Sequence, residues 1–350
     1  MKYLKSLPLL IILTILPAGP AVAQCTVASV QFENDIGLGG TDRHYTHGSR
    51  ASCMSDNQAA RSTARDIAGA ASFGLGGVPM IDTGGDVRYS IGLGQAMFTP
   101  EDLTRSDLID DDRPYAGWLF GSFGLVLGPR HRQRPGSTAF DRMEALQLTL
   151  GVVGPVSGAD RTQKLVHSVI GAQKPRGWRN QLHNEPGVIL EYEQKWRSES
   201  WNLLPGSDGL QVDMMPSAGV ALGNIHTYGS VAATFRFGNR LANDFGPPRI
   251  RPSVAGSEYY EPRPDERLGA YMFVSVGGRA VARNIFLDGN SFRSSHSVDR
   301  KVLVGDLQFG AVVSLWGTAR VSLTHIIRSR EFEEQDSVSQ FSAFSLSFRF

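Results

Sequence analysis

The last twelve residues of the chain, SQFSAFSLSFRF, alternate apolar and polar side chains with a period of two. On one face of an extended chain lie Phe344, Leu346, Phe348 and Phe350, and on the other Ser345, Ser347 and Arg349. This period is that of a β-strand with one apolar face. The pattern recurs in runs of about ten residues separated by polar, Gly-rich or Pro-rich turns. After residue 23 no stretch has the ~20 apolar residues that a transmembrane helix needs. The sequence therefore predicts an all-β fold.

Two all-β architectures fit this alternation, a soluble sandwich and a membrane barrel. The strands are long and numerous, and their polar faces carry the charges and glycines suited to a wet lumen. The chain also ends on an aromatic residue, Phe350, inside its final strand, which resembles the C-terminal signature of outer-membrane barrels. We therefore expect a transmembrane antiparallel β-barrel of about twelve strands, an even number that places both termini in the periplasm. The expected strands lie near residues 27–35, 46–54, 86–98, 115–128, 141–153, 187–197, 210–223, 225–238, 270–283, 300–316, 318–328 and 340–350.

The first 23 residues have the composition of a secretion signal. Lys2 and Lys5 precede the apolar run LPLLIILTILPAGP, and Ala21-Val22-Ala23 supplies the small residues of a cleavage site. We predict a signal peptide over 1–23 and a barrel domain over 24–350, in the bacterial outer membrane. The barrel domain has two cysteines, Cys25 and Cys53. They would lie opposite each other, close enough for a disulfide, if the first hairpin is symmetric about Gly39. The sequence leaves open whether the two cysteines are bonded or free.

Alternation assigns each connection to one side of the membrane. On the periplasmic side we expect a short helix over 55–75 and an irregular segment over 239–269. On the extracellular side, polar residues concentrate in three loops, 36–45, 99–114 and 154–186. In the third loop DRTQKLVHSVIG predicts a helix over 160–171 that Asp160 caps and Gly171 ends. Its apolar stripe is Leu165, Val169 and Ile170, and His167 points away from that stripe.

Long motifs in these loops carry a family resemblance. They are FENDIGLGGTDRHYTHG, DDRPYAGWLFGSFGL, LGVVGP and VHSVIGAQKPRGWRNQLHNEPG, followed by the closing barrel strands. In this order and spacing, they resemble the lipid A 3'-O-deacylase family of outer-membrane barrels. The resemblance implies a twelve-stranded, calcium-using carboxylic ester hydrolase. Its reaction, a lipopolysaccharide modification, removes the ester-linked 3'-acyloxyacyl chain of lipid A.

The resemblance also implies a set of site residues on the extracellular rim. The family's Asn-Asp pair matches Asn34 and Asp35, its threonine in Tyr-Thr-x-Gly matches Thr46, and its helix histidine matches His167. A basic residue of the second outer loop corresponds to Arg105, where a relative carries lysine. Two positions depart from the relative, because Gln173 replaces a carboxylate and Pro175 replaces a tyrosine.

From these residues we expect water to attack the ester directly, because the chain has no GxSxG nucleophile elbow. His167 would be the general base, since the pKa of histidine lies near neutral pH. Asp35 would be a ligand of Ca²⁺, with backbone carbonyls of residues 37–40. Asn34 and Thr46 would orient water or donate to the oxyanion, and Arg105 would add positive charge.

Other functions compete with this hypothesis. A non-catalytic barrel, either a narrow channel or a lipid-binding protein, would also have charged inner faces. A phospholipase would need a serine nucleophile such as Ser157 or Ser168. A histidine metal site could use His44, His47 and His183, although their spacing is not that of a zinc site. With a net charge of +1, nothing indicates a nucleic-acid partner. We expect a monomer in contact with lipid A and outer-membrane lipid.

Overall fold

A computed structural model describes residues 25–35, 44–55, 87–128, 141–203, 209–239, 241, 243–246, 259–261 and 267–350. The expected signal peptide, the tip of the first loop (36–43) and most of the predicted helix 55–75 lie outside these residues. Among the described residues no helix is both long and apolar enough to cross a bilayer.

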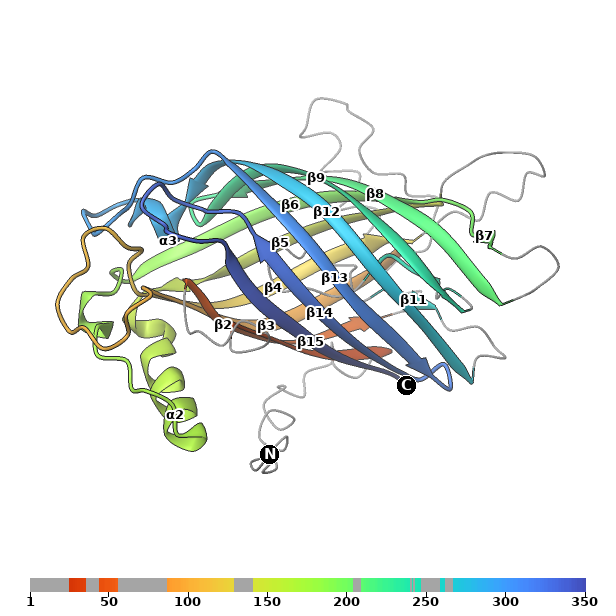
Figure 1. Cartoon of the computed structure of the whole chain (residues 1–350), viewed down its shortest axis with the longest axis horizontal. Coiled ribbons are helices and arrows are strands. Elements are labelled where there is room, and N and C mark those ends of the chain that lie inside the picture. Colours follow the sequence, from red (N-terminus) through yellow and green to blue (C-terminus); the bar gives the residue numbers. More distant parts are fainter. Residues whose placement is uncertain are drawn as a thin grey trace.

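Twelve long antiparallel strands form a closed barrel (Figure 1). The sheet runs through consecutive strands from β1 to β6 in one direction and back from β15 to β8 in the other. It closes where β1 pairs with β15 and where β6 pairs with β8. The two-residue β7 (Trp201–Asn202) only extends β8. The predicted fold class and strand number are therefore confirmed. The barrel strands are β1 (Val27–Asn34), β2 (His44–Ser55), β3 (Val87–Thr99), β4 (Ala116–Leu127), β5 (Asp141–Val153), β6 (Glu185–Arg197), β8 (Leu210–Gly223), β9 (His226–Asn239), β12 (Leu268–Asn284), β13 (Leu303–Leu315), β14 (Ala319–Arg328) and β15 (Ser339–Arg349).

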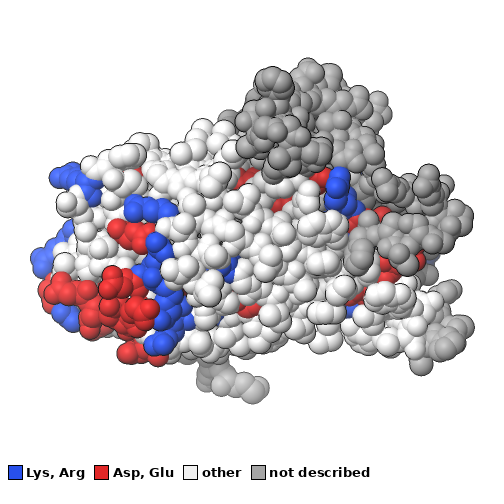
Figure 2. All heavy atoms as spheres, turned by 90° about the horizontal axis from the view of Figure 1, so that it is seen from above, with Lys and Arg blue, Asp and Glu red and all other residues white. Residues whose placement is uncertain are grey.

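The barrel wall is apolar outside and polar inside, the reverse of a soluble protein. Along β12 exposed and buried residues alternate strictly over nine positions. The exposed ones include Met272, Val274 and Val276, whereas the luminal side of the barrel buries Arg236, Arg320 and Arg328. In Figure 2 acidic and basic side chains gather toward the two ends of the molecule, and the wall between them is largely uncharged. This uncharged belt is the surface that faces membrane lipid.

Apolar side chains cross the lumen near its extracellular end. Phe98 of β3 stacks on Phe286 at 4.0 Å between ring centroids, and Tyr45 packs against Phe98 and Phe341 at 5.4 and 5.1 Å. Phe286 belongs to the short helix α3 (Ile285–Asp288), which follows β12. Residues from β4, β6, β8 and β9 join the same buried cluster, which we call the aromatic cap. Because its members come from all around the barrel, the cap fills the outer end of the lumen.

A segment between β9 and β12 occupies the other end. The paired strands β10 (Asn243–Asp244) and β11 (Tyr260–Glu261) lie here, and we call residues 243–246 and 259–261 the periplasmic plug. Asp244 is fully buried, at 2.5 Å from Arg236 Nη1 and 2.7 Å from Arg320 Nη2, two luminal arginines. We predicted an irregular periplasmic segment over 239–269. In the described part of this segment, ion pairs with luminal arginines hold the chain against the inner wall.

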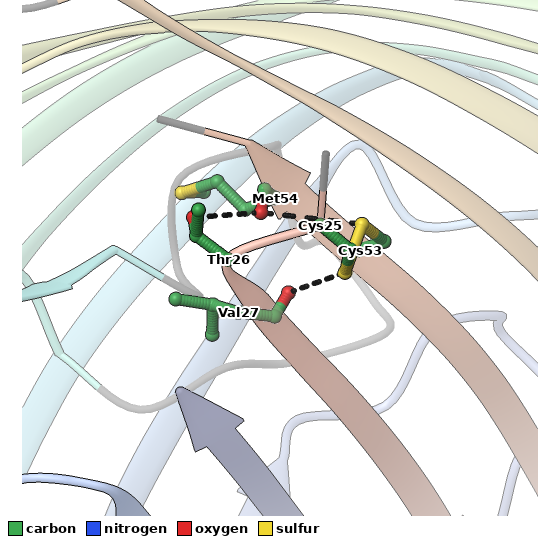
Figure 3. The surroundings of a disulfide bond; sticks show 5 residues. All are labelled: Cys25, Thr26, Val27, Cys53 and Met54. Carbon is green, nitrogen blue, oxygen red and sulfur yellow. Dashed lines mark hydrogen bonds between the residues drawn. A yellow bond between two sulfur atoms is a disulfide. The ribbon is translucent and has the colours of Figure 1, made fainter. Parts of the chain in front are cut away.

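Cys25 and Cys53 form a disulfide, with 5.6 Å between their Cα atoms (Figure 3). The hairpin is not symmetric about Gly39, since Cys53 lies directly opposite Ala28. The disulfide forms nevertheless. Cys25 precedes β1, and the chain there is held to β2 by Thr26, whose N–H and hydroxyl both donate to the Met54 carbonyl at 2.9 and 3.1 Å. The bond therefore fastens the start of the barrel to the periplasmic end of β2.

Replacing both cysteines by serine should lower the free energy of unfolding by about 2–4 kcal/mol, because the disulfide restrains the unfolded chain. Urea titration of the barrel in detergent, followed by its heat-dependent mobility on gels, measures the change. Reducing agent added to the folded wild-type barrel should produce the same shift. A double variant that unfolds at the wild-type urea concentration would contradict this role.

Candidate active site

The extracellular end of β2 contains a β-bulge at Thr46. The register with β3 shifts between Tyr45 and His47, so that Thr46 is the extra residue. Its hydroxyl oxygen lies 2.6 Å from the Thr99 hydroxyl, and its carbonyl accepts a hydrogen bond from Asn34 Nδ2 at 3.0 Å. The structure therefore brings together two of the predicted site residues, Asn34 and Thr46.

These residues lie on the outside of the barrel wall. Asn34 is directly opposite His47, which in turn is opposite Met97, and residues directly opposite in a sheet point to the same face. Met97 packs with Ala159 and Trp178 of the third outer loop. On the same face of β3, Leu93 is 49% exposed in the lipid-facing belt. Asn34 and Thr46 therefore stand on the outer wall above the lipid-facing belt, and not in the lumen.

Asp35 directly follows the last paired residue of β1 and is buried. Alternation gives it the parity of Glu33, which is buried on the luminal side. Asn34 therefore points to the face opposite that of Glu33 and Asp35. Asp35 stands where the chain leaves the sheet toward residues 36–43, which lie outside the described part.

The third outer loop is fixed to the wall where its helix starts. The backbone N–H of Gly154 donates to the Gly117 carbonyl at 2.9 Å, and Gln95 Nε2 donates to the Ser157 carbonyl at 2.7 Å. A Cβ atom at Gly117 would come within 2.4 Å of the Ala159 side chain, so only glycine permits this approach. The helix α2 (Ala159–Ile170) therefore begins in direct contact with β4 and β3.

The predicted helix is confirmed, but its N-terminal cap is not. The N-cap is Gly158 in a left-handed conformation, whereas Asp160 lies inside the first turn, where a carboxylate favours the helix dipole. Gly171 ends the helix as expected, with a positive φ of 72°. The orientation of α2 also differs from that of an amphipathic helix in a soluble protein. His167 is only 3% exposed, whereas the apolar Leu165 and Val169 face outward.

His167 is held in one orientation by the backbone that follows the helix. Its Nδ1 lies 2.5 Å from the carbonyl oxygen of Gln173. A carbonyl can only accept, so Nδ1 carries the hydrogen, and in the neutral ring Nε2 is the nitrogen that takes up a proton. Gln173 replaces a carboxylate of the relative, yet it supports His167 through its main chain, and its side chain is exposed. This departure therefore leaves the contact with His167 intact.

One neighbour of His167 was missed by the sequence analysis. Gln163, one helical turn before His167, is buried and accepts a hydrogen bond from Trp178 Nε1 at 2.6 Å. Trp178 also packs against Tyr115, with 5.1 Å between ring centroids. The spacing of four residues from Ala159 to Gln163 to His167 is the available signal, since it puts all three on one helix face.

The second and third outer loops are joined by hydrogen bonds. The N–H of Arg176 donates to the Leu103 carbonyl at 2.9 Å, and Arg179 Nε donates to the Ser106 carbonyl at 2.8 Å. Arg105 lies in this segment but is exposed, 2.5 Å from Asp107. The hydrogen bond and charge of Asp107 raise the pKa of Arg105 above its ordinary value. Its described partners are thus acidic residues of its own loop.

A buried ion pair connects the second outer loop to the last one. Arg113 lies between the rings of Phe98 and Phe332, 5.7 Å from each centroid, and its Nη2 is 3.3 Å from Glu331. Burial lowers the pKa of Arg113, and the charge of Glu331 opposes that shift. Beside it, His296 Nε2 lies 2.7 Å from the Asp112 carbonyl. The second, third and last outer loops, with the loop that contains His296, are therefore joined into one rim around the aromatic cap.

The described residues contain no group of three or more His, Cys, Asp or Glu side chains that could hold a metal ion. Calcium, however, takes carboxylate, amide and backbone oxygens together. Such oxygens are present at the end of the first hairpin, on Asn34 and Thr46 at the outer wall and on Asp35 where the chain leaves the sheet. The donor set there fits calcium in kind, and it does not fit zinc, which prefers nitrogen and sulfur.

The serine alternative finds little support in the geometry. Ser157 is buried, and its hydroxyl donates to the Gly154 carbonyl at 2.6 Å, which closes the turn before α2. Ser168 lies on the exposed side of α2, away from the buried face of His167. Neither hydroxyl has a described histidine beside it as a base.

Comparisons with known proteins identify the family of this chain. A family model described as outer membrane protein LpxR matches residues 7–350. Among solved structures, LpxR from Salmonella typhimurium matches with a TM-score of 0.69 and 17% identity, over 93% of this chain and 100% of that one. The β domain of the Bordetella autotransporter BrkA has a TM-score of 0.44 and 8% identity, over 93% and 100%. The KdgM porin has a TM-score of 0.37 and 6% identity, over 93% and 99%. No curated protein matches the chain.

The family model covers nearly the whole chain, and the LpxR structure shares its fold. The motifs that resemble a deacylase family lie within the matched residues. The chain therefore belongs to the LpxR family, the outer-membrane lipid A deacylases.

Proposed function

We propose that this barrel hydrolyses the ester that links the 3'-acyloxyacyl chain to lipid A, with His167 as general base. The observation that carries the proposal is the orientation of His167. Its Nδ1 is held by the Gln173 carbonyl, on a helix that packs against the outer wall at β3 and β4. A lipid in the outer leaflet meets this wall directly, since the site residues stand above the lipid-facing belt.

The reaction requires one water molecule. Nε2 of His167 takes a proton from the water as its oxygen attacks the ester carbonyl carbon. The bond from that carbon to the sugar oxygen then breaks, and the same proton passes from Nε2 to the leaving oxygen. The products are a free acyloxyacyl acid and a sugar hydroxyl.

The first hairpin would stabilise the negative charge that develops on the carbonyl oxygen. Asn34 and Thr46 are in contact and carry the amide and hydroxyl hydrogens for this task. Each such donor typically contributes ~10²–10³ in rate. Arg105 would add positive charge from the second loop. Asp35 would hold Ca²⁺ together with oxygens of the first loop, and the bound ion would polarise the ester carbonyl.

The contents of the lumen argue against the alternative function, a channel or a non-catalytic lipid-binding barrel. The aromatic cap and the periplasmic plug fill the two ends of the lumen. A cavity of about 60 Å³ lies against the aromatic cap and is lined in part by Arg50, Glu191 and Arg279. A channel would need a wider path through the lumen. Neither a channel nor a non-catalytic lipid-binding barrel would need an oriented histidine on the outer wall.

Removal of calcium should abolish hydrolysis. Purified barrel in detergent micelles with lipid A should release the acyloxyacyl acid in the presence of Ca²⁺ and none above background with excess chelator, because carbonyl polarisation is lost. Mass spectrometry of lipid A measures the loss, and re-added Ca²⁺ should restore it. Chelator saturated beforehand with calcium is the control. Full activity in free chelator would refute the metal role while leaving the histidine role standing.

A further inference from the structure

The outward face of α2 is apolar where a soluble helix would be polar. Leu165, Val166 and Val169 are 66, 42 and 64% exposed, whereas the polar Gln163 and His167 are buried. An amphipathic helix normally turns its apolar stripe toward the protein. The stripe of α2 therefore needs another apolar neighbour.

The position of α2 supplies that neighbour. Ala159, at the start of the helix, meets the barrel wall at Gly117. Two residues farther along β4 and on the same face, Leu119 is exposed in the lipid-facing belt. Two strand residues span about 7 Å, so the lipid begins close beneath the helix. In Figure 1, α2 leaves the barrel near its extracellular end and runs outward, across the long axis of the barrel.

The charges on α2 fit a phospholipid surface. Arg161 and Lys164 are exposed on the part of the helix opposite the buried face, and Lys174 is exposed just after it. Lys164 reaches Asp160 at 3.4 Å, a weak contact between exposed groups. A helix with an apolar face flanked by lysine and arginine is typical of segments that lie in the membrane interface.

We propose that α2 is an interfacial helix, whose Leu165, Val166 and Val169 side chains enter the outer leaflet and contact lipid acyl chains. The lipid surface is continuous with the belt that surrounds β3 and β4. The buried face of α2, with His167, is thereby held at the level of the lipid headgroups. This contact does not depend on catalysis, so it can hold even if the proposed reaction is wrong.

The test uses single cysteines that carry an environment-sensitive fluorophore. Leu165→Cys and Val169→Cys probe the apolar face, and Ser168→Cys, on the basic side of the same helix, is the matched control. Cys25 and Cys53 are bonded and take no label, and the unmodified chain gives the background. Each labelled barrel is placed in phosphatidylcholine vesicles, with or without phosphatidylcholine brominated on its acyl chains. Heat-dependent mobility on gels confirms that each variant is folded, and either apolar position suffices if the other fails.

Brominated lipid should quench the label at 165 and 169 at least about twofold more than at 168, and aqueous iodide should show the opposite order. Quenching by iodide at all three positions would mean a hydrated helix and would overturn the proposal. Protection from both quenchers at 165 and 169 would mean that protein, such as a second copy of the chain, covers the face. That result would overturn it equally.

Discussion

His167→Ala should lower the rate of lipid A deacylation by about 10²–10⁴-fold, the usual contribution of a positioned general base. Alanine removes the nitrogen that would take the proton from water, and no other described histidine occupies this face of α2. The Gln173 carbonyl that orients the ring would lose its partner without rearranging the barrel. Released acyloxyacyl acid, quantified by mass spectrometry under single-turnover conditions, measures the rate.

The matched control is Ser168→Ala, the next residue on the same helix, which is exposed and should retain wild-type activity. Both variants should keep the heat-dependent gel mobility of a folded barrel. A His167→Ala barrel with wild-type rate would remove the histidine from the mechanism. If Ser168→Ala instead lost activity, the serine route would replace it.

Asp244→Ala should have the largest effect on stability, about 3–5 kcal/mol in the free energy of unfolding. Two aspartates, Asp213 and Asp244, balance the buried Arg236 and Arg320 at the periplasmic end. Loss of one carboxylate leaves an uncompensated positive charge in a buried site. The plug would also lose the hydrogen bond that Tyr271 donates to Asp244 at 2.9 Å. Urea unfolding in detergent measures the difference.

Asp244→Asn should cost less than Asp244→Ala, because the amide oxygen still accepts hydrogen bonds. Glu333→Ala is the control, since the pair of Glu333 with Lys301 is exposed and should matter little. If Asp244→Ala unfolded at the same urea concentration as Glu333→Ala, the plug would not be held by this charge cluster.

The fold could be predicted because one pattern is repeated twelve times. Most strands carry the period-two alternation, and a slip of one residue would turn the apolar face of such a strand from lipid to lumen. The final strand, with Phe344, Leu346 and Phe348 on one face, is an example. The plug could not be predicted, since residues 239–269 have five prolines and no period, and Asp244 is recognised only through arginines from other strands.

The sequence predicted candidate residues for the site but not how the fold arranges them. The motifs pointed to Asn34, Thr46 and His167, but alternation cannot show the bulge that turns Thr46 toward Thr99 on the outer wall. The sequence also did not show which face of α2 lies against the protein. An apolar stripe of Leu165 and Val169 usually marks a buried face, and here the neighbour is lipid rather than protein. Gln163 was passed over because its role depends on Trp178, fifteen residues away.

Tandem mass spectrometry of lipid A from outer membranes that carry this barrel tests whether the barrel removes the 3'-linked acyloxyacyl chain. We expect lipid A that lacks one acyloxyacyl group, with the missing chain mapped to the 3' position, and unmodified lipid A from cells with folded His167→Ala. Unmodified lipid A from cells with the folded wild-type barrel, on several lipid A types and with calcium present, would contradict the proposed activity. Loss of a chain from another position would contradict the assigned ester.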